Sequence, residues 1–391
     1  MRLPPADLTR RRSTIALLSG LLVLLLSAAG CAGSTAGQAA GTSRAPAASA
    51  PAPAQSAAPA APPSAAATAP PLAGSPAGEP ELVQVAHLAN PSDVYFYLAS
   101  EKGYFREQGI EIELHLFDTG AQIIAPMSAG QLDVGRGTIS AGLFNAFGRG
   151  LPIRIVASQS RIIPGTNHFA LVIRSDLAGQ IQSYADLRGR VLAYPGESSG
   201  NEVALDRALQ KGNLSLADVQ TVTLGFPDIL SGLGNRALDG GLLVEPLITF
   251  GQQRGVLERW KDASDFTLGQ EVAVLMYAPR FMEMRPDTAR RFMLAYLQGV
   301  REYYEAFFGN KQQQDEVIAV LTQYTSIKDP SVFKQMAPHG VDPNGRVNVE
   351  SLRADQDWFV AHGKQQAPAS MDQVVDHQYV NAALEVLGVR D

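Results

Sequence analysis

The pentapeptide GESSG, Gly196 to Gly200, contains residue types that could do covalent chemistry. It fits the pattern G-x-S-x-G, in which a serine on a sharp turn between a strand and a helix acts as a nucleophile. Ser198 would be that nucleophile, with a later aspartate and a histidine as its partners. The histidines that follow it are His339, His362 and His377. No HGG-type segment that could form an oxyanion hole precedes it, so a secreted serine hydrolase is only an alternative prediction.

The sequence patterns typical of metal and nucleotide sites are missing. The six histidines form no H-x-H or H-x-x-x-H pair, and the chain has a single cysteine. No G-x-x-x-x-G-K-[ST] sequence is present, so the phosphate-binding loop of an ATPase is missing too. We therefore predict a protein that is not an enzyme and that holds no metal and no cofactor.

The single cysteine, Cys31, lies directly after an apolar segment. Arg10 to Arg12 form a basic region, and the uncharged residues Ile15 to Ala29 follow it. LSAAGC resembles a bacterial lipobox, which implies that residues 1–30 are a lipoprotein signal peptide and that Cys31 is lipidated. The expected location is the cell envelope, outside the cytoplasm and anchored to a membrane. A plain cleaved signal, an uncleaved anchor and a twin-arginine signal are the alternatives.

Residues 31–79 are built almost entirely of Ala, Pro, Ser, Gly and Thr. Such a segment cannot bury enough apolar surface to fold, so we predict a disordered tether between the membrane and a folded domain. The charge of the rest of the chain argues against nucleic acid as a partner. Without residues 1–30 the chain has 28 basic and 37 acidic residues and no dense Lys/Arg stripe.

From residue 80 onward, strand and helix patterns alternate. Leu82 to Val85 predicts a strand, a helix begins near Val94, and apolar residues alternate with polar ones from Ile110 to Leu116. This strand–helix–strand order implies parallel pairing, and it continues until helical patterns take over after Pro286. We expect an α/β protein with parallel sheets in two lobes and a helical C-terminal tail on lobe one. A barrel is the alternative.

Four segments, in this order, resemble one family of transport proteins. They are YLASEKGYFREQGIEIEL, AGQLDVGRGTISAGLFNAFGRGLPIRIVA, DLRGRVLAYPGESSGNEVALDRALQKGNLSLADVQTV and LSGLGNRALDGGLLVEP. They resemble type II solute-binding proteins of ABC importers, in the group that serves nitrate, sulfonates, taurine and thiamine pyrimidine precursors. The resemblance covers about residues 81 to 390. It implies a monomer with the periplasmic-binding-protein type II fold, which gives a small solute to an ABC permease with its ATPase.

The resemblance also implies how the folded part divides. Lobe one would comprise residues 80–174 and 270–391, and lobe two residues 175–269. The chain would cross between the lobes near Ile173 to Ser175 and near Thr267 to Val272. Some relatives in the thiamine branch are enzymes, but an exported chain would not serve their intracellular role. A receptor module that senses a ligand without transporting it is a further alternative.

Ligands of parallel sheets bind outside the carboxyl ends of the strands, where loops lead into helices. Free backbone N–H groups at the helix starts add hydrogen-bond donors there. The residues that this rule selects for ligand binding are Asn90, Ser92, Asp93, Tyr95, Thr119, Gly120, Ala121, Thr138, Ser140, Ser198, Ser199, Gly200, Asn201, Asp228 and Glu245. Each hydroxyl or carboxylate among them could instead cap a helix, and Tyr95 and Phe226 could belong to the core.

The same loops contain few basic residues. Arg136 is near them in the sequence, whereas Asp93, Glu197, Asp228 and Glu245 are acidic. A small anion would need compensation from helix N-termini or from Arg136. This composition favours a neutral or cationic nitrogenous solute, aromatic ones included, and a sulfonate-like solute is the alternative.

Overall fold

The computed structural model describes residues 79–390, with the exception of residue 167. The predicted signal peptide, the predicted lipidation site Cys31 and residues 31–78 of the predicted tether lie outside the described residues. In the part that is described, no helix is both long enough and apolar enough to cross a membrane.

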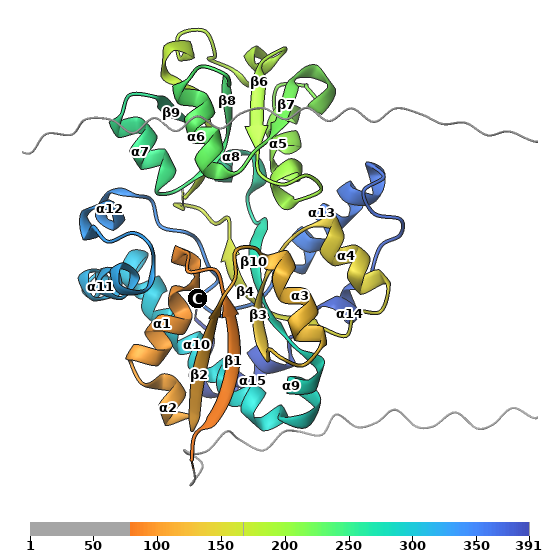
Figure 1. The fold of residues 1–391 in the computed structure, drawn as a ribbon, viewed down its shortest axis with the longest axis vertical. Helices are drawn as coiled ribbons and strands as arrows, with labels where there is room; N and C mark the ends of the chain where they lie inside the picture. Colours follow the sequence, from red (N-terminus) through yellow and green to blue (C-terminus); the bar gives the residue numbers. More distant parts are fainter. Residues whose placement is uncertain (1–78, 167, 391) are drawn as a thin grey trace, which may run out of the picture. The chain divides into compact units, whose positions relative to one another are not determined.

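Two five-stranded sheets organise the described residues (Figure 1). The first sheet has the order β2-β1-β3-β10-β4 and the second has the order β7-β6-β8-β5-β9. The strands of the first sheet are β1 (Glu81–His87), β2 (Ile110–Leu116), β3 (Val134–Thr138), β4 (Arg154–Arg161) and β10 (Glu271–Tyr277). Those of the second sheet are β5 (Phe169–Arg174), β6 (Val191–Tyr194), β7 (Gln220–Thr223), β8 (Gly240–Val244) and β9 (Leu257–Asp262).

We call the first sheet with its helices lobe one, and the second sheet with its helices lobe two. The helices before and after the strands of lobe one are α1 (Val94–Glu101), α2 (Tyr104–Glu107), α3 (Gly120–Ser128) and α4 (Ala141–Gly148). The helices of lobe two are α5 (Gly200–Gln210), α6 (Phe226–Gly234), α7 (Leu247–Gln253) and α8 (Ala263–Thr267). Short 3-10 helices lie at Pro91–Asp93, Ser175–Leu177, Tyr184–Leu187 and Leu216–Asp218.

The tail after β10 is helical, as expected. Its helices are α9 (Pro279–Met284), α10 (Pro286–Phe307), α11 (Gln314–Tyr324), α12 (Pro330–Gln335), α13 (Val349–Ala361), α14 (Met371–Val374) and α15 (Gln378–Leu387). Phe292 and Tyr296 of α10 are fully buried and pack against Phe96 of α1. The tail therefore shares the core of lobe one, although α13 also reaches lobe two.

The two lobes have separate apolar cores. In lobe two, successive residues of β5 point to opposite faces of the sheet, as strand geometry requires. Leu171 packs in the cluster that contains Leu205 of α5, while Val172 packs in the cluster that contains Ile229 of α6. Helices thus cover both faces of this sheet, which fits the apolar sequence of its central strands.

The strand directions correct part of the prediction. β1 pairs with β2 and β3 in parallel, but β10 runs antiparallel to both β3 and β4. β5 likewise runs antiparallel to β8 and β9. Each of these two strands enters its sheet directly from the other lobe and not from a crossover helix, so the rule for βαβ units does not apply to it.

The first crossing between the lobes lies earlier than expected. β5 belongs to the second sheet, so the chain crosses at residues 162–168 and not near Ile173 to Ser175. Residues 169–174 accordingly belong to lobe two. The second crossing runs from the end of α8 to the start of β10, at residues 268–270.

Candidate functional site

A cavity of about 420 Å³ is lined by both lobes and by the tail. Lobe one contributes Leu88, Asn90, Pro91, Ser92, Asp118, Arg136, Thr138, Ile139, Ser160, Glu271 and Val272. Lobe two contributes Phe169, Gly200, Asn201, Phe226, Val244 and Glu245, the crossings contribute His168 and Gln270, and the tail contributes Met336, Ala337 and His339. The volume lies within the range of sites for small organic molecules, roughly 300–1,000 Å³.

Arg136 provides the only guanidinium group in this lining. It lies on β3, the middle strand of its sheet, between Gly135 and Gly137. A Cβ atom at Gly135 would lie 2.6 Å from Met127 Sδ, and one at Gly137 would lie 2.8 Å from Met276 Sδ. Because alternate residues of a strand face opposite sides, the two glycines let β3 pack closely on one side while Arg136 faces the other.

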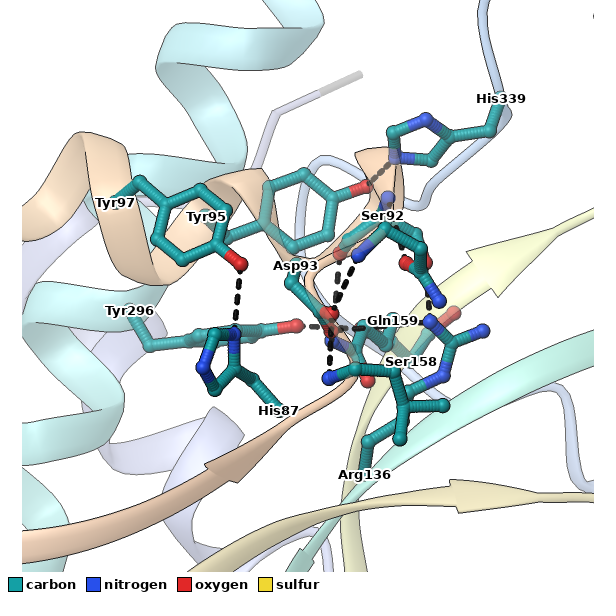
Figure 2. Close-up of polar contacts among 12 residues, drawn as sticks. His87, Ser92, Asp93, Tyr95, Tyr97, Arg136, Ser158, Gln159, Tyr296 and His339 are labelled. Carbon is teal, nitrogen blue, oxygen red and sulfur yellow. Dashed lines mark hydrogen bonds and ion pairs between the residues drawn. The ribbon is translucent and has the colours of Figure 1, made fainter. Parts of the chain in front are cut away.

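The Arg136 side chain is held at one edge only (Figure 2). Its Nη1 donates a hydrogen bond to Ser92 Oγ at 2.7 Å and lies 3.7 Å from Asp93 Oδ1. Its Nε is buried and has no hydrogen-bond partner among the described residues. Arg136 as a residue is 8% exposed, so this free donor is not simply solvated.

Asp93 is fully buried behind Arg136 and is held by neighbouring donors. Its Oδ2 accepts hydrogen bonds from the backbone N–H groups of Leu88, at 3.0 Å, and Asn90, at 3.2 Å. Gln159 Nε2 donates to its Oδ1 at 3.0 Å. Asp93 therefore shapes the loop after β1 and compensates the charge of Arg136, but it does not line the cavity.

Two histidines border the cavity as neutral rings. His339 lies between two tyrosine hydroxyls, with Nε2 at 2.8 Å from Tyr95 Oη and Nδ1 at 2.9 Å from Tyr303 Oη. Burial holds the pKa of His339 well below its ordinary value. Burial, helped by the positive charge of Arg136, also lowers the pKa of His168 to about 3. His168 Nδ1 is buried and has no hydrogen-bond partner within the described part of the chain.

The two glutamates of the lining are both held by the protein. Glu245 Oε2 accepts from Thr249 N at 3.0 Å and from Thr249 Oγ1 at 2.8 Å, and Glu245 Oε1 pairs with Arg259. Glu271 lies 3.9 Å from Arg161 and also accepts hydrogen bonds from Ser158 and from a backbone N–H of the tail. Burial raises the pKa of Glu271 to about 7.

The lobes contact each other directly at one rim of the cavity. Ala141 N donates to Ser198 O at 2.8 Å, and Gly200 N donates to Ile139 O at 3.0 Å. These two bonds join the start of α4 in lobe one to the start of α5 in lobe two. Gln270, on the second crossing, adds a bond from its Nε2 to Gly200 O at 3.0 Å.

Six of the predicted site residues line the cavity. They are Asn90, Ser92, Thr138, Gly200, Asn201 and Glu245. Thr138 is the last residue of β3, and the other five follow the end of a strand, as the rule for α/β sheets requires. Phe226, for which a core position was the alternative, also lines the cavity.

The other predicted residues lie elsewhere. Tyr95 is fully buried in the core of lobe one, the position that was the alternative prediction for this residue. Asp228 is exposed on α6 and does not belong to the cavity lining. The remaining predicted residues that lie outside the lining are Asp93, Thr119, Gly120, Ala121, Ser140, Ser198 and Ser199. Ser140 and Ser199 serve as N-caps of α4 and α5, the alternative weighed for hydroxyl residues at these positions.

The arrangement around Ser198 does not form a serine hydrolase triad. Its backbone N–H donates to Glu202 Oε2 at 2.6 Å, and its carbonyl oxygen accepts from lobe one. Of the candidate bases, His339 is held by tyrosines, His362 stacks on Trp358, and His377 Nε2 is buried without a hydrogen-bond partner among the described residues. Within residues 79–390, residue 167 excepted, no cluster of three or more side chains could hold a metal ion.

Several lining residues had no clear signal in the sequence. His168 and Gln270 lie on the crossings, while Met336, Ala337 and His339 come from the tail, where no strand end marks a site. Asp118 is the exception, because it directly precedes a predicted helix start. Arg136 lies within β3 and not after its end, so the rule for strand ends does not select it.

The comparisons with known proteins agree with this architecture. A family model described as NMT1/THI5 like matches residues 90–306, which is more than half of the chain. The chain belongs to the NMT1/THI5-like family. Similar solved structures show the fold of this NMT1/THI5-like protein. The periplasmic aliphatic sulphonate binding protein SsuA from Escherichia coli has a TM-score of 0.61 and 18% identity, with 76% of this chain and 93% of SsuA covered.

Proteins that are similar to this chain in sequence are named for different functions. A protein of Brucella abortus (strain 2308), named only as a binding protein, is 23% identical over 69% of this chain and 82% of its own length. The riboflavin-binding protein RibY of Chloroflexus aurantiacus is 28% identical over 58% of this chain and 64% of its own. A 4-amino-5-hydroxymethyl-2-methylpyrimidine phosphate synthase of Schizosaccharomyces pombe is 25% identical over 44% of this chain and 45% of its own. The architecture is the periplasmic-binding-protein type II fold, which also carries an enzyme, the desulfurization enzyme DSZB, at a TM-score of 0.57.

Proposed function

We propose that this NMT1/THI5-like protein is the solute-binding component of an ABC importer. In this proposal it works outside the cytoplasm, anchored to a membrane by a lipid on Cys31, and gives its solute to a permease with an ATPase. The observation that carries the proposal is the cavity between two lobes with separate cores, because both lobes and the tail line it. A ligand in this cavity would contact both lobes at once.

The mechanism that we propose is hinge closure. Two chain segments, residues 162–168 and residues 268–270, connect the lobes, and each is short enough to act as a hinge. A ligand that contacts both lobes only in the closed state shifts the population toward that state. The contacts between the starts of α4 and α5 would then form on closure and break on release.

The proposed solute is a small organic molecule. The cavity has apolar walls at Phe226, Val244 and Met336, and polar groups between them, as is typical of sites for such ligands. The names of similar proteins mention sulphonates, riboflavin and a pyrimidine. We propose the same range here, namely a nitrogenous or aromatic solute or a sulfonate-like one, bound by a monomer.

Binding without chemistry distinguishes this proposal from the enzymatic functions of the synthase and of DSZB. The purified protein should be incubated with a mixture of small metabolites, washed, denatured, and analysed for retained molecules by mass spectrometry. We expect one solute to be retained unchanged and to raise the melting temperature by mass action. Recovery of a chemically altered solute would favour an enzyme, and retention of no solute would refute the proposal.

A sensing module would bind the same solute but would not support its uptake. Deletion of the gene should abolish uptake of the labelled solute by cells, and a copy of the gene should restore it. Normal uptake in the deletion strain, with binding intact in the purified protein, would favour the sensing alternative.

A further inference from the structure

The tail helix α13 contacts both lobes. It lies beside α4 of lobe one and α5 of lobe two (Figure 1). Its residues Leu352 and Phe359 are fully buried in the core cluster of lobe one, and the ring of Phe359 lies 6.2 Å from that of Phe144 on α4. One side of α13 is therefore fixed to lobe one, so the contacts that its other side makes with lobe two must break when the lobes move apart.

The contacts of α13 with α5 involve buried carboxylates. Trp358 Nε1 donates a hydrogen bond to Asp206 Oδ2 at 2.8 Å, and Asp206 is 4% exposed. Arg207 Nη2 lies 2.8 Å from Oδ1 of Asp355, whose side chain is fully buried. Hydrogen bonds to charged groups are stronger than those between neutral groups, so these two contacts favour the state in which α5 lies against α13.

The face of α5 that meets α13 allows close contact. Gly200, Val203 and Arg207 lie on one side of this helix, because they are spaced i, i+3 and i+7. Val203 is fully buried in the core cluster of lobe one, although α5 belongs to lobe two. A Cβ atom at Gly200 would lie 3.7 Å from Asp355 Oδ2. At this contact, lobe two therefore places an apolar side chain in the core of lobe one.

The tail also supports the rim at which the lobes meet. Lys364, which follows α13, has its Nζ 3.4 Å from Glu202 Oε1 on α5. Glu202 Oε2 accepts a hydrogen bond from Ser198 N at 2.6 Å. The carbonyl oxygen of Ser198 in turn accepts the interlobe hydrogen bond from Ala141 N. The contact with Lys364 therefore orients the same turn that closes the rim.

A second contact between the tail and lobe two is weaker. Gln253 of α7 donates a hydrogen bond to Gln335 of α12 at 2.7 Å, and both residues are exposed. A hydrogen bond between exposed neutral side chains contributes little, because water replaces it when it breaks. The contact of α13 with α5 therefore contributes more to holding the lobes together.

We propose that α13 is a clasp that holds the lobes closed before a solute arrives and thereby sets the apparent solute affinity. Asp355, Trp358 and Lys364 bind α5 in the closed state and release it on opening, and none of them lines the cavity. If the solute binds the closed state, its apparent dissociation constant is the intrinsic one divided by the closed fraction. This inference rests on the hinge closure of the proposed function and concerns the regulation of the same site.

Hydrogen exchange of the purified, solute-free protein tests the clasp. The N–H groups of Ala141 and Gly200 donate across the lobes, so peptides that contain them exchange slowly only while the lobes are closed. We expect Trp358→Phe and Lys364→Met each to speed this exchange about fivefold or more, because each variant loses a contact with a buried carboxylate. Exchange of the β10 amides should not change, which separates lobe opening from unfolding.

Matched variants elsewhere are the controls. Trp260→Phe replaces the other tryptophan, which packs against Tyr184 in lobe two, and Lys334→Met removes a pair with Asp315 inside the tail. Neither control should change the exchange of the rim peptides. If one clasp variant loses the protection of β10, the other decides. Unchanged exchange in a folded clasp variant overturns the inference, and so does fast exchange of the rim peptides in the wild type.

The outcome is separable from that of the proposed function, because the exchange test uses no solute. If the clasp variants exchange as the wild type does while a solute is retained from the metabolite mixture, the solute-binding function stands and the inference is wrong. Calorimetry with that retained solute should show weaker binding to Trp358→Phe, by the factor by which the closed fraction falls. If no solute is retained, the proposed function is wrong, and so is the role of the clasp in solute affinity.

Discussion

Replacing Arg207 by methionine should destabilise the protein far more than the loss of a surface charge would. Arg207 lies on α5 of lobe two, and its Nη2 is 2.8 Å from Oδ1 of Asp355, on α13 of the tail. The side chain of Asp355 is fully buried, whereas that of Arg207 is 24% exposed. In Arg207→Met the Asp355 carboxylate keeps a hydrogen bond from Gln270 Nε2, at 3.0 Å, but loses its counter-charge.

The expected magnitude follows from this burial. Removing one partner of a buried ion pair costs about 3–5 kcal/mol, because the other charge stays buried without compensation. In domains of 150–250 residues, 1 kcal/mol corresponds to about 2–4 °C in melting temperature, so we expect a loss of roughly 6 °C or more at pH 8. The exposed pair Arg188 and Asp218 provides the control, and Arg188→Met should cost about 1 kcal/mol or less.

The pKa of Asp355 determines how the destabilisation by Arg207→Met changes with pH. Burial raises the pKa of Asp355 to about 6 from an ordinary 3.8, even with Arg207 present. The folded state thus holds the Asp355 proton more tightly than the unfolded state does. The contribution of this group to stability is present below pH 4 and is lost as the pH rises through about 6. Without Arg207 the pKa moves higher still, so Arg207→Met should destabilise less at pH 5 than at pH 8.

The assay is thermal unfolding of the wild type, Arg207→Met, Asp355→Asn and the double variant at both pH values. Asp355→Asn removes the buried charge, so in the double variant it should recover about 1–3 kcal/mol of the loss caused by Arg207→Met at pH 8. A loss in Arg207→Met no larger than in Arg188→Met would refute the reasoning. So would the same loss at pH 5 and at pH 8.

Three further predictions concern other parts of the molecule. Burial raises the pKa of Glu271 to about 7, so the free energy of unfolding of Glu271→Gln should rise relative to that of the wild type from pH 5 to pH 8, by up to about 3 kcal/mol. A constant difference between the two proteins across a pH series of melting curves would contradict this. A Cβ atom at Gly241 would lie 2.5 Å from the carbonyl oxygen of Ala193, so Gly241→Ala should lower the free energy of unfolding by about 1–3 kcal/mol, measured in urea. Gly179→Ala is the control, because a Cβ atom there would meet open space. Equal urea midpoints for the two variants would show that the sheet adjusts to the added methyl group. Cys31→Ser should move the protein from the membrane fraction to the soluble fraction outside the cytoplasm and remove the lipid mass seen by mass spectrometry, and an unchanged distribution would exclude lipid anchoring through this residue.

Much of the local structure could be predicted from the sequence because short-range rules decide it. Apolar alternation in β2 and the capping residues before α3, α4 and α5 mark these elements within a few residues. β9 was not predicted, since LERWKD has charged residues without a regular apolar period. In this case pairing with β5 at the edge of the sheet, and not the local pattern, makes the strand.

The residues of the candidate site also fall into those that the sequence predicts and those that it does not. Residues such as Asn90, Thr138 and Glu245 were predictable, because strand ends in α/β folds meet at one edge of the sheet. Asp228 satisfied the same rule but is exposed and does not line the cavity, since the rule locates a loop and not the direction of each side chain. His339 could not have been predicted, because the tail brings it to the site from far along the chain.

The sequence by itself determined the α/β alternation, the helical tail and the loops that could meet a ligand, because periodicity and capping depend on neighbours along the chain. Only the tertiary structure decided that β5 joins the second sheet, that Asp93 compensates Arg136, and that tail residues complete the cavity. Those outcomes depend on contacts between segments that are distant in the sequence. A sequence pattern predicts that a residue is buried, but it does not predict which residues it contacts.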